Sequence, residues 1–199
     1  MTRIKSALER AMERIEQIEA PDPVEKLEWE FIPMGRKLAG SHMKIEGDPF
    51  KKFSSSVDEA KPYLKQGMME VFISNVQLPK NEIIDATNKR AFEGLGILLQ
   101  EDKSAKDLLE RAIYVTQQYA QYGNPQREQA YLELKKQIEQ VVMESLARQP
   151  GGANPQAPGQ IRVETMPEFQ QQWMKISSQI DHQYEQHLGQ IRQELIDLT

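Results

Sequence analysis

The feature that most constrains the fold is a long apolar stripe near the C-terminal end of the chain. Large apolar residues recur there every three or four positions, and the eight steps between them span 29 residues. The stripe consists of Phe169, Trp173, Ile176, Ile180, Tyr184, Leu188, Ile191, Leu195 and Leu198. A mean step of about 3.6 residues keeps these side chains on one face of a straight α-helix. The sequence therefore predicts one long amphipathic helix in this region.

A helix-start signal precedes the stripe. Thr165 and Glu168 have the spacing of a capping box, and Pro167 stands where a first helical residue belongs. The predicted helix would be about 48 Å long. Burying one large apolar side chain stabilises the folded state by about 1.5–3 kcal/mol relative to leaving it in water. The stripe therefore has to be covered. Either the rest of the chain covers it or another subunit or partner protein does, and we favour the second interpretation.

A linker separates this helix from the rest of the chain. Residues 149–160, "QPGGANPQAPGQ", contain three prolines and three glycines among polar residues. Such a segment buries too little apolar surface to offset the entropy lost on ordering. We therefore predict a helical domain at 1–148, a flexible Gly/Pro linker at 149–160, and a docking or oligomerisation helix at 161–199.

The predicted fold class is all-α, with an irregular helical bundle in the first domain. Residues 104–148 show two runs of helical periodicity around Gly123, Asn124 and Pro125, which suggests an αα-hairpin with a turn at these residues. Residues 40–56 are rich in Gly, Pro and Ser and are predicted to be a loop. Residues 68–76 fit a helix or a strand, and we prefer the helix.

The first twenty residues carry a second apolar seam, in which Ile4, Leu8, Ile15 and Ile18 follow heptad spacing. Packing on the chain's own domain and pairing with another chain both fit this pattern. Together with the C-terminal stripe, the seam supplies the predicted protein-interaction residues, which are Ile4, Leu8, Ile15, Ile18, Phe169, Trp173, Ile176, Ile180, Tyr184, Leu188, Ile191 and Leu195. Phe169, Trp173 and Ile176 are the expected anchors, because aromatic residues concentrate interface energy.

The sequence contains few signals for catalysis or metal binding. The chain has no cysteine, which excludes disulfides, thiolate nucleophiles and thiolate metal sites. Its three histidines do not form a chelating pair, because His182 and His187 are five residues apart and His42 is isolated. We therefore predict a protein without metal or cofactor that is not an enzyme. An enzyme with an unrecognised carboxylate site is the third alternative.

Composition also disfavours polyanionic partners. The formal net charge is −5, and the mean hydropathy of −0.65 suits helices with large solvated faces. The one locally basic segment is 35–53, in which "PFKKF" places two lysines between Phe50 and Phe53. A nucleic-acid-associated regulator that uses this segment is the runner-up function.

The N-terminal segment is too polar for a signal peptide, and no apolar run is long enough to span a membrane, so we expect a soluble cytoplasmic protein. The opening "IKSALERAMERIEQIE" and the later "GRKLAG" resemble the start of an uncharacterised family of small bacterial helical proteins, a resemblance that implies no activity. The best-supported function is a structural or accessory protein that assembles with copies of itself or with a larger protein complex.

Overall fold

The computed structural model describes residues 22–148 and 162–198, apart from the side chains of Leu146 and Ala147. Every regular element in these residues is helical, which confirms the all-α fold class. Residues 68–76 lie almost entirely in a helix, as preferred. The helices are α2 (Pro23–Met43), α3 (Pro49–Ser54), α4 (Lys61–Asn75), α5 (Glu82–Leu98), α6 (Lys103–Gln118), the π-helix η1 (Tyr119–Gly123), α7 (Asn124–Ala147), the 3-10 helix η2 (Val163–Thr165) and α8 (Pro167–Ile196).

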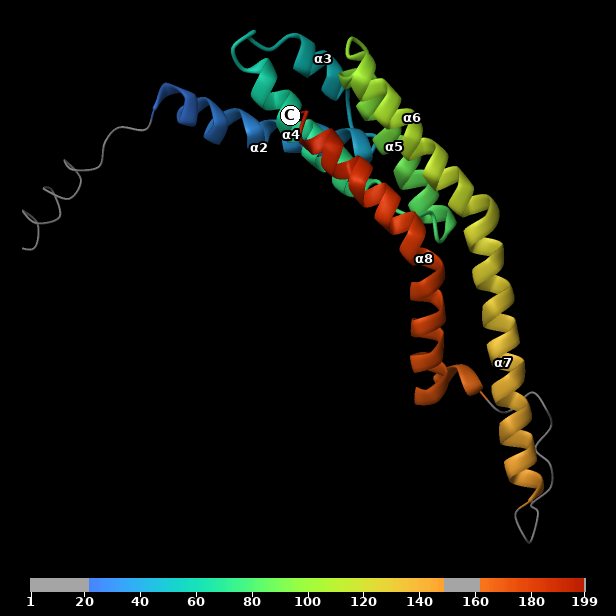
Figure 1. The fold of residues 1–199 in the computed structure, drawn as a ribbon. Helices are drawn as coiled ribbons and strands as arrows, with labels where there is room; N and C mark the ends of the chain where they lie inside the picture. Colours follow the sequence, from blue (N-terminus) through green and yellow to red (C-terminus); the bar gives the residue numbers. More distant parts are fainter. Residues whose placement is uncertain (1–21, 149–161, 199) are drawn as a thin grey trace, which may run out of the picture.

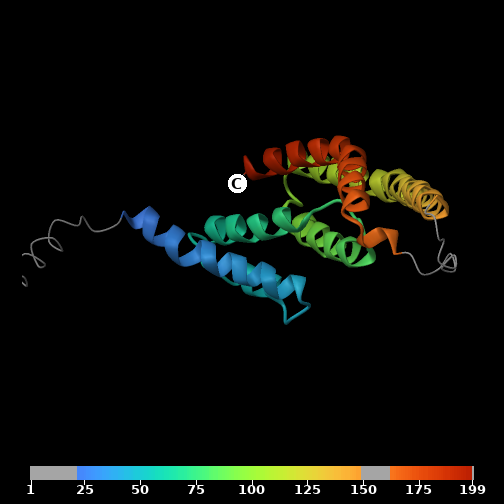
Figure 2. The ribbon, with the colours of Figure 1, turned by 90° about the horizontal axis from the view of Figure 1, so that it is seen from below.

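The helices lie in three tiers, which Figure 2 shows from below. The middle tier is formed by α4 and α5, with α2 and α3 on one side and α6 and α8 on the other. Apolar side chains from all of these helices meet in one main core, whose fully buried members include Met68, Phe72, Leu95 and Leu188. In Figure 1 α7 extends away from this core.

Two glycines allow α2 and α4 to cross at backbone contact. A Cβ atom on Gly67 would lie 2.1 Å from the Ile32 carbonyl oxygen, and one on Gly35 would lie 2.2 Å from the Leu64 carbonyl oxygen. Any side chain at either position would force the helices apart. The crossing holds α2 against the middle tier.

The predicted loop at 40–56 is partly wrong. The helix α2 continues to Met43, and the separate helix α3 begins at Pro49. Asp48 caps α3 by accepting a 2.9 Å hydrogen bond from the Lys51 backbone N–H, and the proline takes the first helical position. The same Asp-Pro signal, at Asp22 and Pro23, opens α2. Because the segment is rich in Gly, Pro and Ser, the sequence predicted a loop, and the helix that begins at Pro49 was missed.

The predicted αα-hairpin is also wrong, because α6, η1 and α7 follow one another as one long bent helix (Figure 1). In an ordinary α-helix Pro125 would clash with the carbonyl one turn back. Here the turn before it is a wider π turn, in which the Asn124 N–H donates to the Tyr119 carbonyl. Gly123 does not end the helix. Its missing side chain makes room for the Tyr119 ring, which would lie 2.6 Å from a Cβ atom.

The C-terminal helix α8 begins at Pro167, as predicted, and runs to Ile196. The capping box does not form, because the N-cap is Met166, and the Thr165 hydroxyl donates to the Arg162 carbonyl instead. Figure 1 shows α8 bent part-way along, whereas the spacing of its stripe predicted a straight helix. It packs on α4, α6 and α7. The predicted linker at 149–160 lies outside the described residues.

Candidate functional site

The apolar stripe of α8 faces the chain's own helices. Phe169, Leu188, Ile191 and Leu195 are buried, whereas Trp173, Ile176, Ile180 and Tyr184 are half-buried. The last member, Leu198, is exposed. From the sequence, cover by another subunit or a partner protein was favoured, whereas in the structure the chain's own helices lie over the stripe. The matching apolar face is supplied by α6, η1 and α7, in which Ala112, Tyr119 and Leu134 are buried.

The three expected anchors lie at the start of α8 and form part of a small second core. Phe169 and Trp173 both meet the Tyr131 ring edge-on, at centroid distances of 5.2 and 5.1 Å, and Ile176 packs nearby. Leu134 and Val163 are the other buried members of the cluster. The N-terminal seam of Ile4, Leu8, Ile15 and Ile18 lies outside the described residues.

The most densely bonded polar cluster surrounds Asp181 on α8. Its Oδ1 accepts a 2.8 Å hydrogen bond from the Tyr119 hydroxyl. Its Oδ2 accepts one of 2.7 Å from Arg127 Nη1 and lies 2.8 Å from Lys80 Nζ. These four residues, named here the Asp181 cluster, join α8 to η1, to α7 and to the connection between α4 and α5.

Electrostatics in the Asp181 cluster follow from its contacts. Burial alone would raise the pKa of Asp181, but the hydrogen bonds from Lys80, Tyr119 and Arg127 outweigh burial, and the pKa is lowered. Burial raises the pKa of Tyr119, and its hydrogen bond to the carboxylate raises it further. Both groups therefore keep their ordinary charge states at neutral pH, Asp181 ionised and Tyr119 neutral.

Sequence reasoning missed the Asp181 cluster. Its members come from four separate segments, and no local motif connects them. A weak signal existed, since Asp181 directly follows Ile180 of the apolar stripe and so lies near the covered face of α8. A carboxylate in that position needs partners when the helix docks. The sequence does not say which residues they are.

The basic segment 35–53 is only partly available to a nucleic acid. Phe50 packs against the rings of His42 and Phe72, and Phe53 lies against the main core, so neither ring is free to stack on bases. Arg36 Nε lies 2.7 Å from Glu70 Oε2. Lys44, Lys51 and Lys52 remain exposed. The structure thus separates the aromatic and cationic parts of this candidate surface.

The histidines do not converge. His42 Nε2 lies 3.0 Å from the Arg90 carbonyl oxygen, while His182 and His187 are exposed on α8. Across the described part of the chain, His, Asp and Glu side chains nowhere gather in threes as metal ligands would. In the same residues, no helix combines the length and apolar character that a membrane crossing requires.

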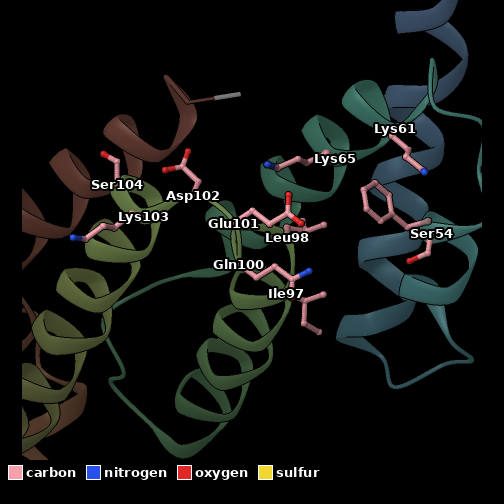
Figure 3. Close-up of a pocket in the computed structure, with 11 residues that line it drawn as sticks. Ser54, Lys61, Lys65, Ile97, Leu98, Gln100, Glu101, Asp102, Lys103 and Ser104 are labelled. Carbon is pink, nitrogen blue, oxygen red and sulfur yellow. The ribbon is translucent and has the colours of Figure 1, made fainter.

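A cleft of about 820 Å³ opens between the α3–α4 side of the molecule and the turn from α5 to α6. Figure 3 shows Lys61 and Lys65 on α4 at one wall, with Glu101 and Asp102 at the other. Phe53, Ile97 and Leu98 contribute apolar surface. Asp102 caps α6 through a 3.0 Å hydrogen bond from the Ala105 N–H, and Lys61 Nζ lies 2.7 Å from Asp58 Oδ1.

A second surface feature is the far end of α7. Leu134 is 3% exposed beneath α8, whereas Val141, two turns further along the same face, is 66% exposed. Figure 1 shows that α7 continues well past the start of α8. The apolar stripe of α7 is therefore longer than the helix that covers it.

Comparison with known proteins gives one match. Residues 50–197 match the sequence model of a family described as "Family of unknown function (DUF6657)". This agrees with the expectation of an uncharacterised family, although the resemblance was noted on residues before 41 and the match begins at residue 50. No curated protein and no solved structure matches the chain.

Proposed function

The chain belongs to this DUF6657 family, and we propose that it is a non-catalytic structural or accessory protein that assembles with other proteins through uncovered parts of its amphipathic helices. The partner is a second copy of the chain or a larger protein complex, and the proposed compartment is the cytoplasm. The proposal rests on the apolar face of α7, which loses its cover beyond α8.

The uncovered part of α7 continues a face that is already used for packing. Leu134 is buried in the same cluster as Phe169 and Trp173, and Tyr131 and Ile138 are half-buried beside it. Val141 follows with most of its side chain in water. A helix face with apolar residues at i, i+3, i+7 and i+10 is the pattern by which helices dock on a partner. Covering it would stabilise an assembly by removing this surface from water.

A second exposed apolar site lies on α2. Trp29 is 68% exposed on this helix. Tryptophan is the residue type most enriched among those that dominate interface energies. We therefore propose Trp29 and the α7 end as two separate points of attachment for other proteins.

The Asp181 cluster supports the non-catalytic part of the proposal. General base catalysis needs a carboxylate that can reach a substrate proton. Asp181 already accepts hydrogen bonds from Tyr119 and Arg127 and pairs with Lys80. Its lowered pKa also makes it a weaker base. The cluster is better suited to holding α8 in place than to moving protons.

The test is self-association of the full chain and of two variants. Val141→Glu places a charge on the uncovered stripe, whereas Gln140→Glu adds the same charge to the neighbouring exposed position off the stripe. Sedimentation equilibrium over a wide concentration range should show a wild-type dimer or higher oligomer. Val141→Glu should weaken the association about tenfold or more, because a buried unpaired charge is costly, and Gln140→Glu should leave it unchanged.

The larger-complex alternative has its own readout. If the wild-type chain is a monomer at every concentration, cross-linking in cells with a photoreactive residue at position 141 should give one stoichiometric protein adduct that is absent when the residue is placed at position 140. A monomer without such an adduct would overturn the proposal.

A further inference from the structure

The cleft in Figure 3 holds charges of both signs that have no partners. Lys65 is half-buried on α4, and Glu101 lies across the cleft in the turn before α6. Neither side chain forms an ion pair or hydrogen bond with the other or with any other described residue. A half-buried ammonium group without a counterion is unfavourable, because it has lost part of its hydration and gained nothing in exchange.

The neighbouring charges do not supply the missing partners. Lys61, one turn before Lys65 on the same face of α4, is occupied by Asp58. Asp102 accepts the capping hydrogen bond at the start of α6, which leaves its negative charge on the same wall as Glu101. Lys103 points away from the space between the walls (Figure 3). The cleft therefore presents the unpaired cation Lys65 on one side and carboxylates without a cationic partner, Glu101 foremost, on the other.

We propose that this cleft binds a small zwitterion of the amino-acid type, whose carboxylate pairs with Lys65 and whose ammonium group pairs with Glu101. The inference goes beyond the proposed role in assembly and does not depend on it. A ligand with only one charge would satisfy one wall and face the like charge on the other. A zwitterion satisfies both.

The rest of the cleft suits an aliphatic side chain. Ile97, Leu98 and Phe53 line it next to the charged groups, and Ile97 is 45% exposed. The volume of about 820 Å³ lies in the range of about 300–1,000 Å³ that is typical of small-molecule sites. An apolar lining with a few convergent polar groups is the usual composition of such sites. Covering Ile97 would favour a branched apolar amino acid over a small one.

Three matched probes separate the contributions of the two charges. L-Leucine carries both charges, 4-methylpentanoate is the same skeleton without the amine, and 3-methylbutylamine is the skeleton without the carboxylate. Each is titrated into the full chain at neutral pH while NMR follows the side-chain amide of Gln100, which lines the cleft. Leucine should shift this signal in a saturable way. Each single-charge probe should bind about tenfold more weakly, as expected for the loss of one charge-assisted contact.

Charge-neutral variants test the two walls. Lys65→Gln and Glu101→Gln should each weaken leucine binding about tenfold. Lys136→Gln and Glu128→Gln remove the same charges from exposed positions on α7 and should leave binding unchanged. Circular dichroism checks that all four variants keep the wild-type helix content.

Three results would overturn the inference. If leucine does not shift the Gln100 amide signal, the cleft does not bind leucine. Equal affinity for 4-methylpentanoate would show a simple anion site. Leucine binding that survives Lys65→Gln and Glu101→Gln would place the ligand elsewhere.

Discussion

The Tyr119 hydroxyl donates a 2.8 Å hydrogen bond to Asp181 Oδ1, which joins the π-helix to the C-terminal helix. Tyr119 is fully buried, and its ring packs edge-on against Tyr184 of α8 as well as over Gly123. The local π turn and the docking of α8 are therefore coupled, because the residue that the π-helix turns inward is also the one that contacts α8.

Replacing Asp181 should test how much this cluster stabilises the fold. Asp181→Asn removes the charge that Arg127 and Lys80 share, leaving two cations beside each other without an anion. The Asp181 side chain is 13% exposed, and Lys80 can turn into water, so we expect a loss of about 2–3 kcal/mol in the free energy of unfolding. Urea unfolding followed by circular dichroism measures it.

The matched control for this experiment is Asp107→Asn, which removes the same charge from an exposed position on α6. It should change the unfolding free energy by no more than about 0.5 kcal/mol. Equal effects of the two substitutions would mean that the Asp181 cluster contributes nothing specific.

The contribution of Asp181 should disappear in acid. Its folded-state pKa is lowered below the unfolded value of about 3.9, so the stabilisation is present above that value and is lost as the pH falls through the folded pKa. The difference in unfolding free energy between wild type and Asp181→Asn should therefore be full near pH 7 and shrink below about pH 4. The lowered pKa values of Asp58 and Glu164 affect both proteins equally. A difference that stays constant down to pH 2 would contradict the assignment.

The α2–α4 crossing gives a prediction in which two glycines behave in opposite ways. Gly67→Ala places a methyl group 2.1 Å from the Ile32 carbonyl oxygen, so the helices must separate, and we expect a loss of about 2–3 kcal/mol despite the better helix propensity of alanine. In Gly40→Ala, on the partner helix α2, the new methyl group meets nothing within 4 Å, and the substitution should stabilise by about 0.5–1 kcal/mol. Thermal unfolding of both variants measures the two signs. Stabilisation by both would show that the backbones do not touch.

Features that depend on local periodicity could be predicted from the sequence. The helix α8 begins at the proline that the start signal indicated, because Pro167 is suited to a first helical position whatever the rest of the fold does. The helical spacing of Tyr131, Leu134 and Ile138 in the sequence likewise matches the face of α7 that packs on α8. What periodicity could not decide was which surface covers each stripe, since that depends on contacts distant in sequence.

The errors have a common physical cause. They concern residues whose effect on the backbone depends on what packs around them in the fold. Gly123 and Pro125 normally mark a helix end and a new start. Here the Tyr119 ring needs the space above Gly123, and the π turn accommodates Pro125, so the helix continues. The cleft was missed for a similar reason, because Lys65 and Glu101 are ordinary surface charges until α4 and the turn before α6 are placed opposite each other.

The intramolecular docking of α8 leads to the last prediction. Leu188 is fully buried in the main core, so Leu188→Ala should lower the unfolding free energy by about 2–5 kcal/mol, from lost burial and the cavity it leaves. Met174→Ala, at a position on the same helix that is 70% exposed, should cost no more than about 0.5 kcal/mol. Because the cover comes from the same chain, the loss caused by Leu188→Ala should be the same in dilute and concentrated protein. A loss that grows with protein concentration would instead mean that the stripe is covered by another chain, since only an intermolecular contact depends on how often two molecules meet.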